Sequence, residues 1–269
     1  MNKYKIESHT HTHFSHDGQM SLGELISEAK KKGLIYLATT EHLDREYIYV
    51  FGNKVRQLDL VEYDKGFNEA KKNVGGMYIA YGLEVGYYNH KDVLNFYETE
   101  LLKYNYDVII NSVHCVAGQD LYYFQSDNED DKLQAYTIYL NAVLESVKVN
   151  YHYDIIGHLG YITRYVPYKE KSLLMPETKG LIDEILKEII KRGKTIELNS
   201  SNKAGGILPE KAILERYFLL GGRHITFGSD AHYAHKLGDR YEQAASLAIS
   251  CGFTHWTIYK NHQKEYVLI

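Results

Sequence analysis

The chain has 269 residues, of which 44% are hydrophobic, and a formal net charge of -4 with its histidines neutral. This length can bury a sizeable core and matches one α/β barrel or two smaller domains, and we expect a single domain over residues 1–269. The chain is slightly acidic and has no long basic run. It therefore lacks the usual signs of a protein that binds nucleic acid or an anionic membrane.

The cysteines and the N-terminal residues indicate the cellular compartment of the protein. Cys115 and Cys251 lie far apart, which argues against a disulfide scaffold and for a reducing environment. The first six residues lack the apolar core of a signal peptide, and no run of about 18 apolar residues could span a membrane. We therefore expect a cytoplasmic protein.

Strand-like apolar runs alternate with segments of helical periodicity along the chain. Strands are predicted over residues 4–8, 34–40, 77–83, 107–113, 154–157, 195–199 and 224–228. Helices are predicted over residues 21–33, 58–72, 92–104, 130–149, 176–191, 209–221 and 240–250, and a last apolar run covers 256–259. An uninterrupted series of strand and helix predicts a parallel (β/α) barrel, with a doubly wound open sheet as the alternative.

Local signals support the helix boundaries. Ser21 and Glu24 have the spacing of a capping box, and Gly33 is a typical helix stop. Pro209 is predicted at the first position of its helix, where a missing backbone N–H costs nothing. These signals place the loops between the elements.

Histidines follow the first predicted strand. His9 and His11 are two residues apart, so in an extended chain both side chains point to the same side and could bind one metal ion. A surface pair of histidines is the alternative for an isolated motif of this kind. The rest of the chain favours the metal, because six of the seven predicted strands end in a residue type that binds metals.

The ends of parallel strands in a (β/α) barrel open at one mouth, where the reactive residues gather. Counting one aspartate in the first loop, the candidate metal ligands are His9, His11, Asp17, His42, Glu84, His114, His158, Asp230 and His232. Because one zinc ion takes about four ligands, this set predicts two or three metal ions, with Glu84 or Asp230 able to bridge them. Nitrogen and carboxylate ligands without a thiolate favour Zn, with Fe or Mn possible.

A metal cluster of this kind lowers the pKa of bound water and neutralises charge on a phosphoryl group. It therefore suits hydrolysis of a phosphate ester. Cleavage of an amide or of a phosphodiester fits almost as well, so the ligand set predicts a reaction type and leaves the substrate open.

These residues in this order resemble the polymerase and histidinol phosphatase (PHP) superfamily of metal-dependent phosphoesterases, whose fold is a distorted seven-stranded, TIM-like barrel. The resembling motifs are His9-Thr10-His11 with Asp17, Thr40-Glu41-His42, Glu84, His114, His158, and Gly228-Ser229-Asp230-Ala231-His232. The resemblance implies three metal subsites, formed by His9, His11, Glu84 and Asp230, by Glu84, His114 and His158, and by Asp17, His42 and His232.

Within that superfamily, several stretches resemble the stand-alone histidinol-phosphate phosphatases of histidine biosynthesis. They cover residues 59–63, 111–114, 157–165 and 196–199. The resemblance implies a small-molecule substrate, L-histidinol phosphate, whose phosphorus is attacked by a metal-bridging hydroxide to give L-histidinol and phosphate.

Further roles are hypotheses. Asp230 or His232 would handle the proton of the leaving group, and Arg164 is the best placed guanidinium for the phosphate. Lys54 and Arg45 are weaker candidates for that contact.

Glu197 could hold the amino group of histidinol or orient a metal-binding histidine. The remaining histidines are interpreted as structural or exposed: His13, His16, His90, His152, His224, His235, His255 and His262.

Two alternative functions remain open. A nucleotide phosphodiesterase or exonuclease of the same superfamily would need a basic track beside stacking aromatic residues, and the chain has the aromatic residues without the basic charge. A metal-binding protein without turnover is the second alternative, although nine ligands exceed the needs of a structural site.

Overall fold

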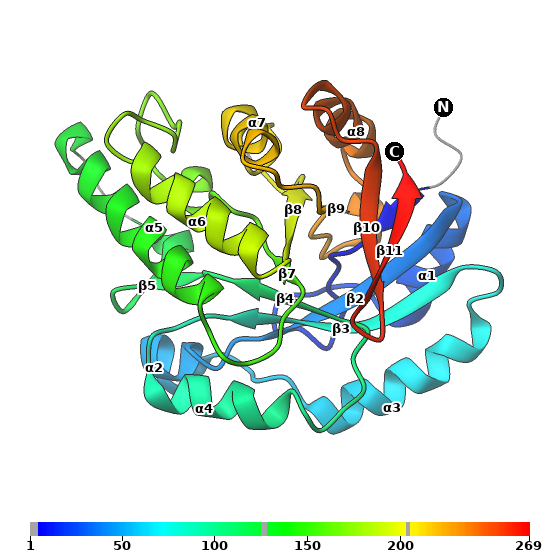
Figure 1. The fold of residues 1–269 in the computed structure, drawn as a ribbon. Helices are drawn as coiled ribbons and strands as arrows, with labels where there is room; N and C mark the ends of the chain where they lie inside the picture. The colour runs from blue at the N-terminus through cyan, green and yellow to red at the C-terminus, as the bar shows by residue number, and fades with distance from the viewer. Residues whose placement is uncertain (1–4, 125–127, 203–204) are drawn as a thin grey trace.

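The fold is seen in a computed structural model that describes residues 5–124, 128–202 and 205–269; residue 4, in the first predicted strand, lies outside these ranges. Seven parallel strands form one sheet in the order β1-β2-β3-β4-β7-β8-β9 (Figure 1). Their bounds are β1 Lys5–Glu7, β2 Leu34–Leu43, β3 Tyr78–Gly86, β4 Val108–Ser112, β7 Ile155–Ile156, β8 Thr195–Asn199 and β9 Ile225–Gly228. Every predicted strand therefore contributes to this sheet.

The first and last strands of the sheet meet, which closes it. Ser8 N–H donates to Phe227 O at 3.0 Å, Asp230 N–H donates to His9 O at 2.9 Å, and Thr10 pairs with Ala231. The barrel is distorted because β7 pairs with each of its neighbours over only two residues. The prediction of a distorted TIM-like barrel is confirmed, and the open doubly wound sheet is excluded.

Eight α-helices connect the strands in the described part of the chain (Figure 1). They are α1 Leu22–Lys31, α2 Tyr47–Phe51, α3 Leu60–Ala70, α4 Lys91–Glu100, α5 Lys132–Val147, α6 Lys179–Lys191, α7 Lys211–Leu219 and α8 Tyr241–Ser250. The capping box at α1 is confirmed, since Ser21 Oγ accepts from Glu24 N–H at 3.2 Å and Glu24 Oε2 accepts from Ser21 N–H at 2.7 Å.

The predicted start of α7 at Pro209 is wrong. The helix begins at Lys211, because Leu208 still forms an antiparallel bridge with Asn199 and holds the chain extended up to the proline. The helix α6 begins at Lys179, three residues after the predicted start at 176, since residues 176–178 form a turn.

The chain ends in an antiparallel hairpin of β10 (His255–Lys260) and β11 (Gln263–Leu268), where the sequence predicted only an apolar run. The hairpin lies against the N-terminal ends of barrel strands. Tyr36 OH of β2 donates to Tyr259 O at 3.0 Å, and Tyr259 OH lies 2.7 Å from Thr195 Oγ1 at the start of β8. A smaller pair, β5 (Cys115–Val116) and β6 (Gln119–Asp120), follows β4.

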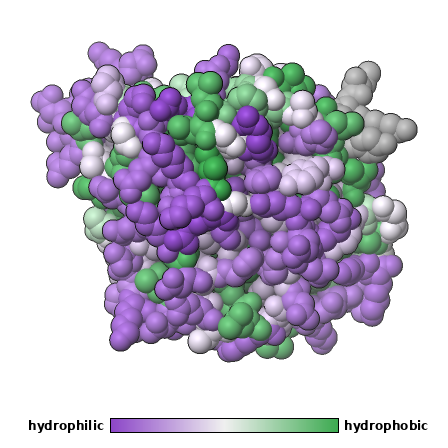
Figure 2. All heavy atoms as spheres, in the orientation of Figure 1, coloured by the Kyte–Doolittle hydropathy of each residue, from purple (hydrophilic) through white to green (hydrophobic). Residues whose placement is uncertain are grey.

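Most of the face shown in Figure 2 is hydrophilic, with apolar side chains in small scattered groups. Within the described ranges, no helix combines the length and the apolar character needed to cross a bilayer. Both cysteines are buried and free.

Candidate metal centre

The nine candidate ligands come from six strands and meet at the mouth where the C-terminal ends of the strands open. His42 and Glu84 lie within β2 and β3, and the other seven follow β1, β4, β7 and β9. Each of the nine residues has a side-chain nitrogen or carboxylate oxygen within 4.0 Å of a nitrogen or carboxylate oxygen of another of the nine. The structure therefore brings together residues that span more than two hundred positions of sequence.

The first group surrounds one oxygen of Glu84. Glu84 Oε2 lies 3.1 Å from His9 Nε2 and 3.3 Å from His11 Nε2. Asp230 Oδ1 lies 3.8 Å and 3.4 Å from the same two nitrogens. All four side chains are buried, so their donor atoms converge on a small space shielded from solvent.

The second group uses the other oxygen of the same carboxylate. Glu84 Oε1 lies 2.8 Å from His158 Nε2 and 3.2 Å from His114 Nε2, and these two nitrogens are 3.3 Å apart. Glu84 Oε1 thus faces His114 and His158, whereas Oε2 faces His9 and His11 and also lies 3.2 Å from His42 Nδ1. This is the arrangement required of a carboxylate that bridges two metal ions.

The third group lies nearer the solvent. Asp17 Oδ2 is 3.2 Å from His232 Nε2, and Asp17 Oδ1 is 3.7 Å from His42 Nε2. The ring of His11 stacks on both imidazoles of this group, with its centroid 4.0 Å from that of His42 and 4.3 Å from that of His232. Asp17 is the most accessible member, with 46% of its side chain exposed.

The close contacts between the donor atoms of the nine residues show whether the residues suit metal ions. His9 Nε2 and His11 Nε2 lie 3.0 Å apart, and Glu84 Oε2 is buried without a hydrogen-bond partner among the described residues. Burial alone raises the pKa of Glu84, but the imidazoles of His9 and His114 outweigh it and hold that pKa well below its usual value. A charged carboxylate among converging imidazole nitrogens is the ligand chemistry of zinc and similar ions, so the residues fit a polynuclear metal centre.

Glu197 lies beneath the first group and is fully buried. Its Oε1 is 2.7 Å from His9 Nδ1, and its Oε2 accepts from the backbone N–H of His158 at 2.6 Å. Of the two roles that the sequence left open, this geometry favours orienting a histidine, because the carboxylate is closed off from the mouth. A glycine makes room for it: a Cβ at Gly228 would lie 2.0 Å from Glu197 Oε1.

Two buried acidic residues beside the cluster were not found by sequence reasoning. Asp44 Oδ2 lies 3.1 Å from His42 Nδ1, and Asp44 Oδ1 lies 3.3 Å from His114 Nδ1. Glu46 Oε1 lies 3.8 Å from the same nitrogen of His114. The signal available was the spacing of His42 and Asp44, two residues apart at a strand end, which places both side chains on one face.

Another acidic residue holds the loop after β1. Glu41 accepts from the backbone N–H and hydroxyl of Thr12 and from the backbone N–H and hydroxyl of Ser15. Ser15 Oγ in turn lies 3.2 Å from His11 Nδ1 and accepts from the backbone N–H of His42 at 2.9 Å. The sequence marked Glu41 only as part of a motif, whereas the structure shows it ordering the loop that carries Asp17.

Arg164 lies inside the site, not on a surface loop. Its guanidinium donates to Asn199 Oδ1 at 2.6 Å and to Asp230 Oδ2 at 3.3 Å, and it stacks over the ring of Tyr161. Its Nε is buried and has no hydrogen-bond partner among the described residues. The weaker candidates for phosphate contact are placed differently: Lys54 is exposed, and Arg45 stacks over a ring of α4.

Comparisons with known proteins identify the family of this chain. The model of the PHP domain matches residues 7–201. A probable histidinol-phosphatase of Clostridium acetobutylicum is 32% identical over 91% of this chain and 93% of its own length, and the histidinol-phosphatase of Lactococcus lactis is 29% identical over 93% and 92%. The crystal structure of histidinol phosphate phosphatase from Lactococcus lactis, complexed with zinc, L-histidinol and phosphate, covers 98% of this chain and 100% of its own, with a TM-score of 0.82 at 27% identity. The chain therefore belongs to the PHP domain family.

Proposed function

We propose that this chain is a metal-dependent phosphomonoesterase that hydrolyses L-histidinol phosphate to L-histidinol and phosphate. The observation that carries the proposal is the position of Glu84, which presents one oxygen to His9 and His11 and the other to His114 and His158. The similarity to histidinol-phosphatases over more than nine tenths of the chain supports the choice of substrate.

The nine ligands would hold two or three divalent ions, for which zinc is the first choice and iron or manganese the alternatives. They fall into the groups His9, His11, Glu84 and Asp230, then Glu84, His114 and His158, and then Asp17, His42 and His232. When bound, such ions polarise the phosphoryl oxygens and lower the pKa of water, which makes hydrolysis of a phosphate ester feasible at neutral pH.

The side chains around these ligands have separate tasks. Arg164 supplies the guanidinium that binds the phosphate. Its stacking on Tyr161 and its contact with Asp230 hold a permanent positive charge beside the cluster. Glu197 holds His9 in place, and Asp44 does the same for His42.

Hydrolysis breaks the bond between phosphorus and the leaving oxygen and forms one to the oxygen of water, so the leaving alkoxide must gain a proton. We assign that proton transfer to Asp230 or His232. Of the two, His232 is the more accessible, with 21% of its side chain exposed against 8% for Asp230.

A comparison of substrates tests the proposal. Phosphate release from L-histidinol phosphate should exceed release from a panel of other phosphomonoesters and cleavage of a nucleotide phosphodiester. A preference for the diester would overturn the choice of substrate in favour of a nucleotide phosphodiesterase or exonuclease. A protein that retains its metals but releases phosphate from none of these esters would instead be a metal-binding protein without turnover.

A further inference from the structure

A second group of potential metal ligands lies at the N-terminal end of the barrel, opposite the mouth that holds Glu84. His152 and Asp154 come directly before β7, and His262 lies in the turn between β10 and β11. One ligand atom of each residue lies within 4.8 Å of those of the other two. Residues more than one hundred positions apart thus meet at a place that the proposed reaction does not use.

The carboxylate of Asp154 lies between the two imidazoles. Asp154 Oδ1 is 3.0 Å from His152 Nε2, and Asp154 Oδ2 is 2.8 Å from His262 Nδ1. The two rings are 4.3 Å apart between centroids and tilted by 70° to each other. Asp154 is buried, whereas 48% of the His152 side chain and 29% of the His262 side chain are exposed, so an ion can reach this group from solvent.

The backbone that carries the group is fixed on both sides. Asp154 N–H donates to Ile109 O at 2.8 Å, and Ile109 N–H donates back to Asp154 Oδ2 at 2.9 Å. In the turn, Asn261 N–H donates to Asp107 Oδ1 at 2.8 Å and His262 N–H donates to Asp107 O at 2.9 Å. The hairpin turn is therefore tied to the chain just before β4.

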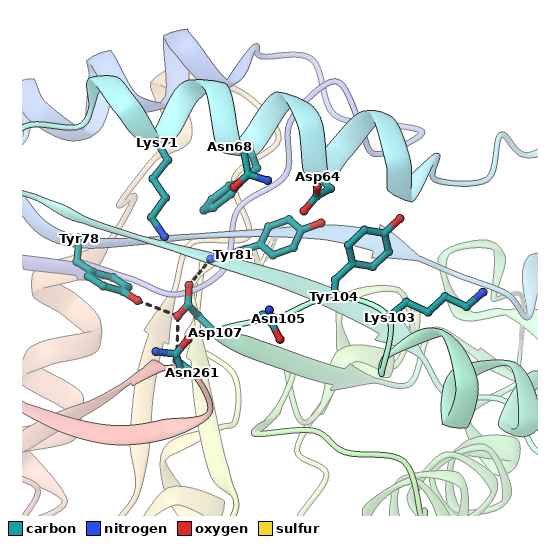
Figure 3. Close-up of a pocket in the computed structure, with 11 residues that line it drawn as sticks. Asp64, Asn68, Lys71, Tyr78, Tyr81, Lys103, Tyr104, Asn105, Asp107 and Asn261 are labelled. Carbon is teal, nitrogen blue, oxygen red and sulfur yellow. Dashed lines mark hydrogen bonds between the residues drawn. The ribbon is translucent and has the colours of Figure 1, made fainter.

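Asp107 is itself held in place, as Figure 3 shows. Its Oδ1 accepts from Tyr78 OH at 2.8 Å and its Oδ2 from Tyr81 N–H at 2.9 Å, on one wall of a pocket of about 410 Å³. His262 has a φ of 62°, a left-handed conformation that is uncommon for a non-glycine residue. This conformation lets the turn present the imidazole to Asp154.

Two lysines near the group form their hydrogen bonds elsewhere. Lys194 and Lys264 act on Asp154 through their charges, but their ammonium groups donate to the backbone carbonyls of Tyr153 and Gly193. Two imidazoles and one carboxylate are a ligand set that zinc accepts, with water in the remaining position.

We propose that His152, Asp154 and His262 bind one divalent transition-metal ion, such as Zn²⁺, that fastens the β10–β11 hairpin to the N-terminal end of the barrel. The role is structural, because this end of a (β/α) barrel supports stability and its catalytic residues lie at the other end. The proposal is independent of the phosphatase activity.

The test compares the zinc content of the wild-type protein with that of His262→Asn and His152→Asn. Asparagine tolerates the left-handed conformation at position 262, so the turn is kept while the imidazole is removed. Each protein is equilibrated with excess Zn²⁺, freed of unbound metal and analysed for zinc per chain, and its phosphate release from L-histidinol phosphate is measured in parallel. His255→Asn, an exposed histidine at the start of β10, is the matched control.

We expect each variant to hold one zinc equivalent fewer than the wild type and the control, with phosphate release unchanged. Added Zn²⁺ should also raise the melting temperature of the wild type more than that of either variant. Equal zinc content in all four proteins would overturn the proposal. The three residues would then be joined by hydrogen bonds only. A zinc loss accompanied by loss of phosphate release would also overturn it, because the lost ion would then belong to the catalytic mouth.

Discussion

Glu197 Oε1 lies 2.7 Å from Nδ1 of His9, the ring nitrogen on the opposite side from the one that faces Glu84. A carboxylate in this position accepts a hydrogen bond from Nδ1–H, which keeps the imidazole proton on Nδ1 and leaves the lone pair of Nε2 for a metal ion. The buried residues behind the nine ligands therefore set the chemical state of the ligands as well as their orientation.

Replacing Glu197 with glutamine should lower both metal affinity and the rate of phosphate release by about 10- to 100-fold. The amide keeps the volume of the side chain but removes the charge that fixes the tautomer of His9. Zinc binding by competition with a chelator, and phosphate release at saturating zinc, measure the two effects. Glu242→Gln, at a mostly exposed glutamate, is the control. Wild-type values for both quantities in Glu197→Gln would remove the role given to this carboxylate.

Asp44→Asn should weaken the metal centre to a similar degree, by about 10- to 100-fold in affinity or activity. Asp44 faces Nδ1 of both His42 and His114, and an amide can offer an oxygen to only one of them. The other imidazole would then meet an N–H and carry its proton on the nitrogen needed for metal.

The matched control for this change is Asp59→Asn. Asp59 caps the N-terminus of α3, a position where asparagine performs as well as aspartate, so this variant should behave as the wild type. If Asp44→Asn retains the zinc affinity and activity of this control, the carboxylate does not organise the two histidines.

Gly228→Ala tests the close packing beneath the cluster. A Cβ at this position would lie 2.0 Å from Glu197 Oε1 and 2.6 Å from His9 Cβ, so both side chains would have to move. We expect a loss of stability of about 1–3 kcal/mol and a fall in activity of more than about tenfold. Urea unfolding and phosphate release measure these effects against Gly180→Ala, where a Cβ meets no heavy atom within 4 Å. Unchanged activity in Gly228→Ala would show that this packing does not position the ligands.

A pH dependence is expected at the ion pair that joins α6 to α7. Arg216 donates to both oxygens of Asp183, at 2.6 and 2.7 Å, and these hydrogen bonds, together with one from Lys179, lower the pKa of Asp183 to about 2. Because the folded pKa lies below the ordinary value of 3.8, the stabilisation is complete above that value and is lost as pH falls toward 2. Asp183→Asn should therefore cost about 1 kcal/mol near neutral pH and progressively less below pH ~4, as followed by urea unfolding. A cost that does not change between neutral pH and pH ~3 would contradict this origin.

The convergence of the nine candidate ligands could be predicted from the sequence because a parallel barrel directs the C-terminal ends of its strands to one mouth. The strand boundaries were less accurate, and β2 is the clearest case. The apolar run predicted an end at Thr40, but β2 continues to Leu43, and His42 is the ladder partner of Glu84 in β3. Polar ligands buried at a strand end do not follow the apolar pattern on which the prediction depends.

The supporting residues could not be predicted in the same way. Asp44 and Glu46 lie in a segment without regular periodicity, and apart from the spacing of His42 and Asp44 nothing in the sequence indicates that both are buried against histidines. The β10–β11 hairpin was missed because β11 alternates mostly exposed residues and lacks an apolar run. Contacts that depend on barrel closure, such as Glu197 with His9, join residues 188 positions apart and appear only once the strands are assembled.

The most direct test of the proposed function compares phosphate release from L-histidinol phosphate by the wild-type protein, His42→Ala and Asp230→Asn after equal loading with zinc. Both variants alter a proposed ligand at the mouth of the barrel, so we expect turnover to fall by orders of magnitude while circular dichroism shows the fold unchanged. Near wild-type rates in both variants would contradict the assignment of these residues to a catalytic metal centre.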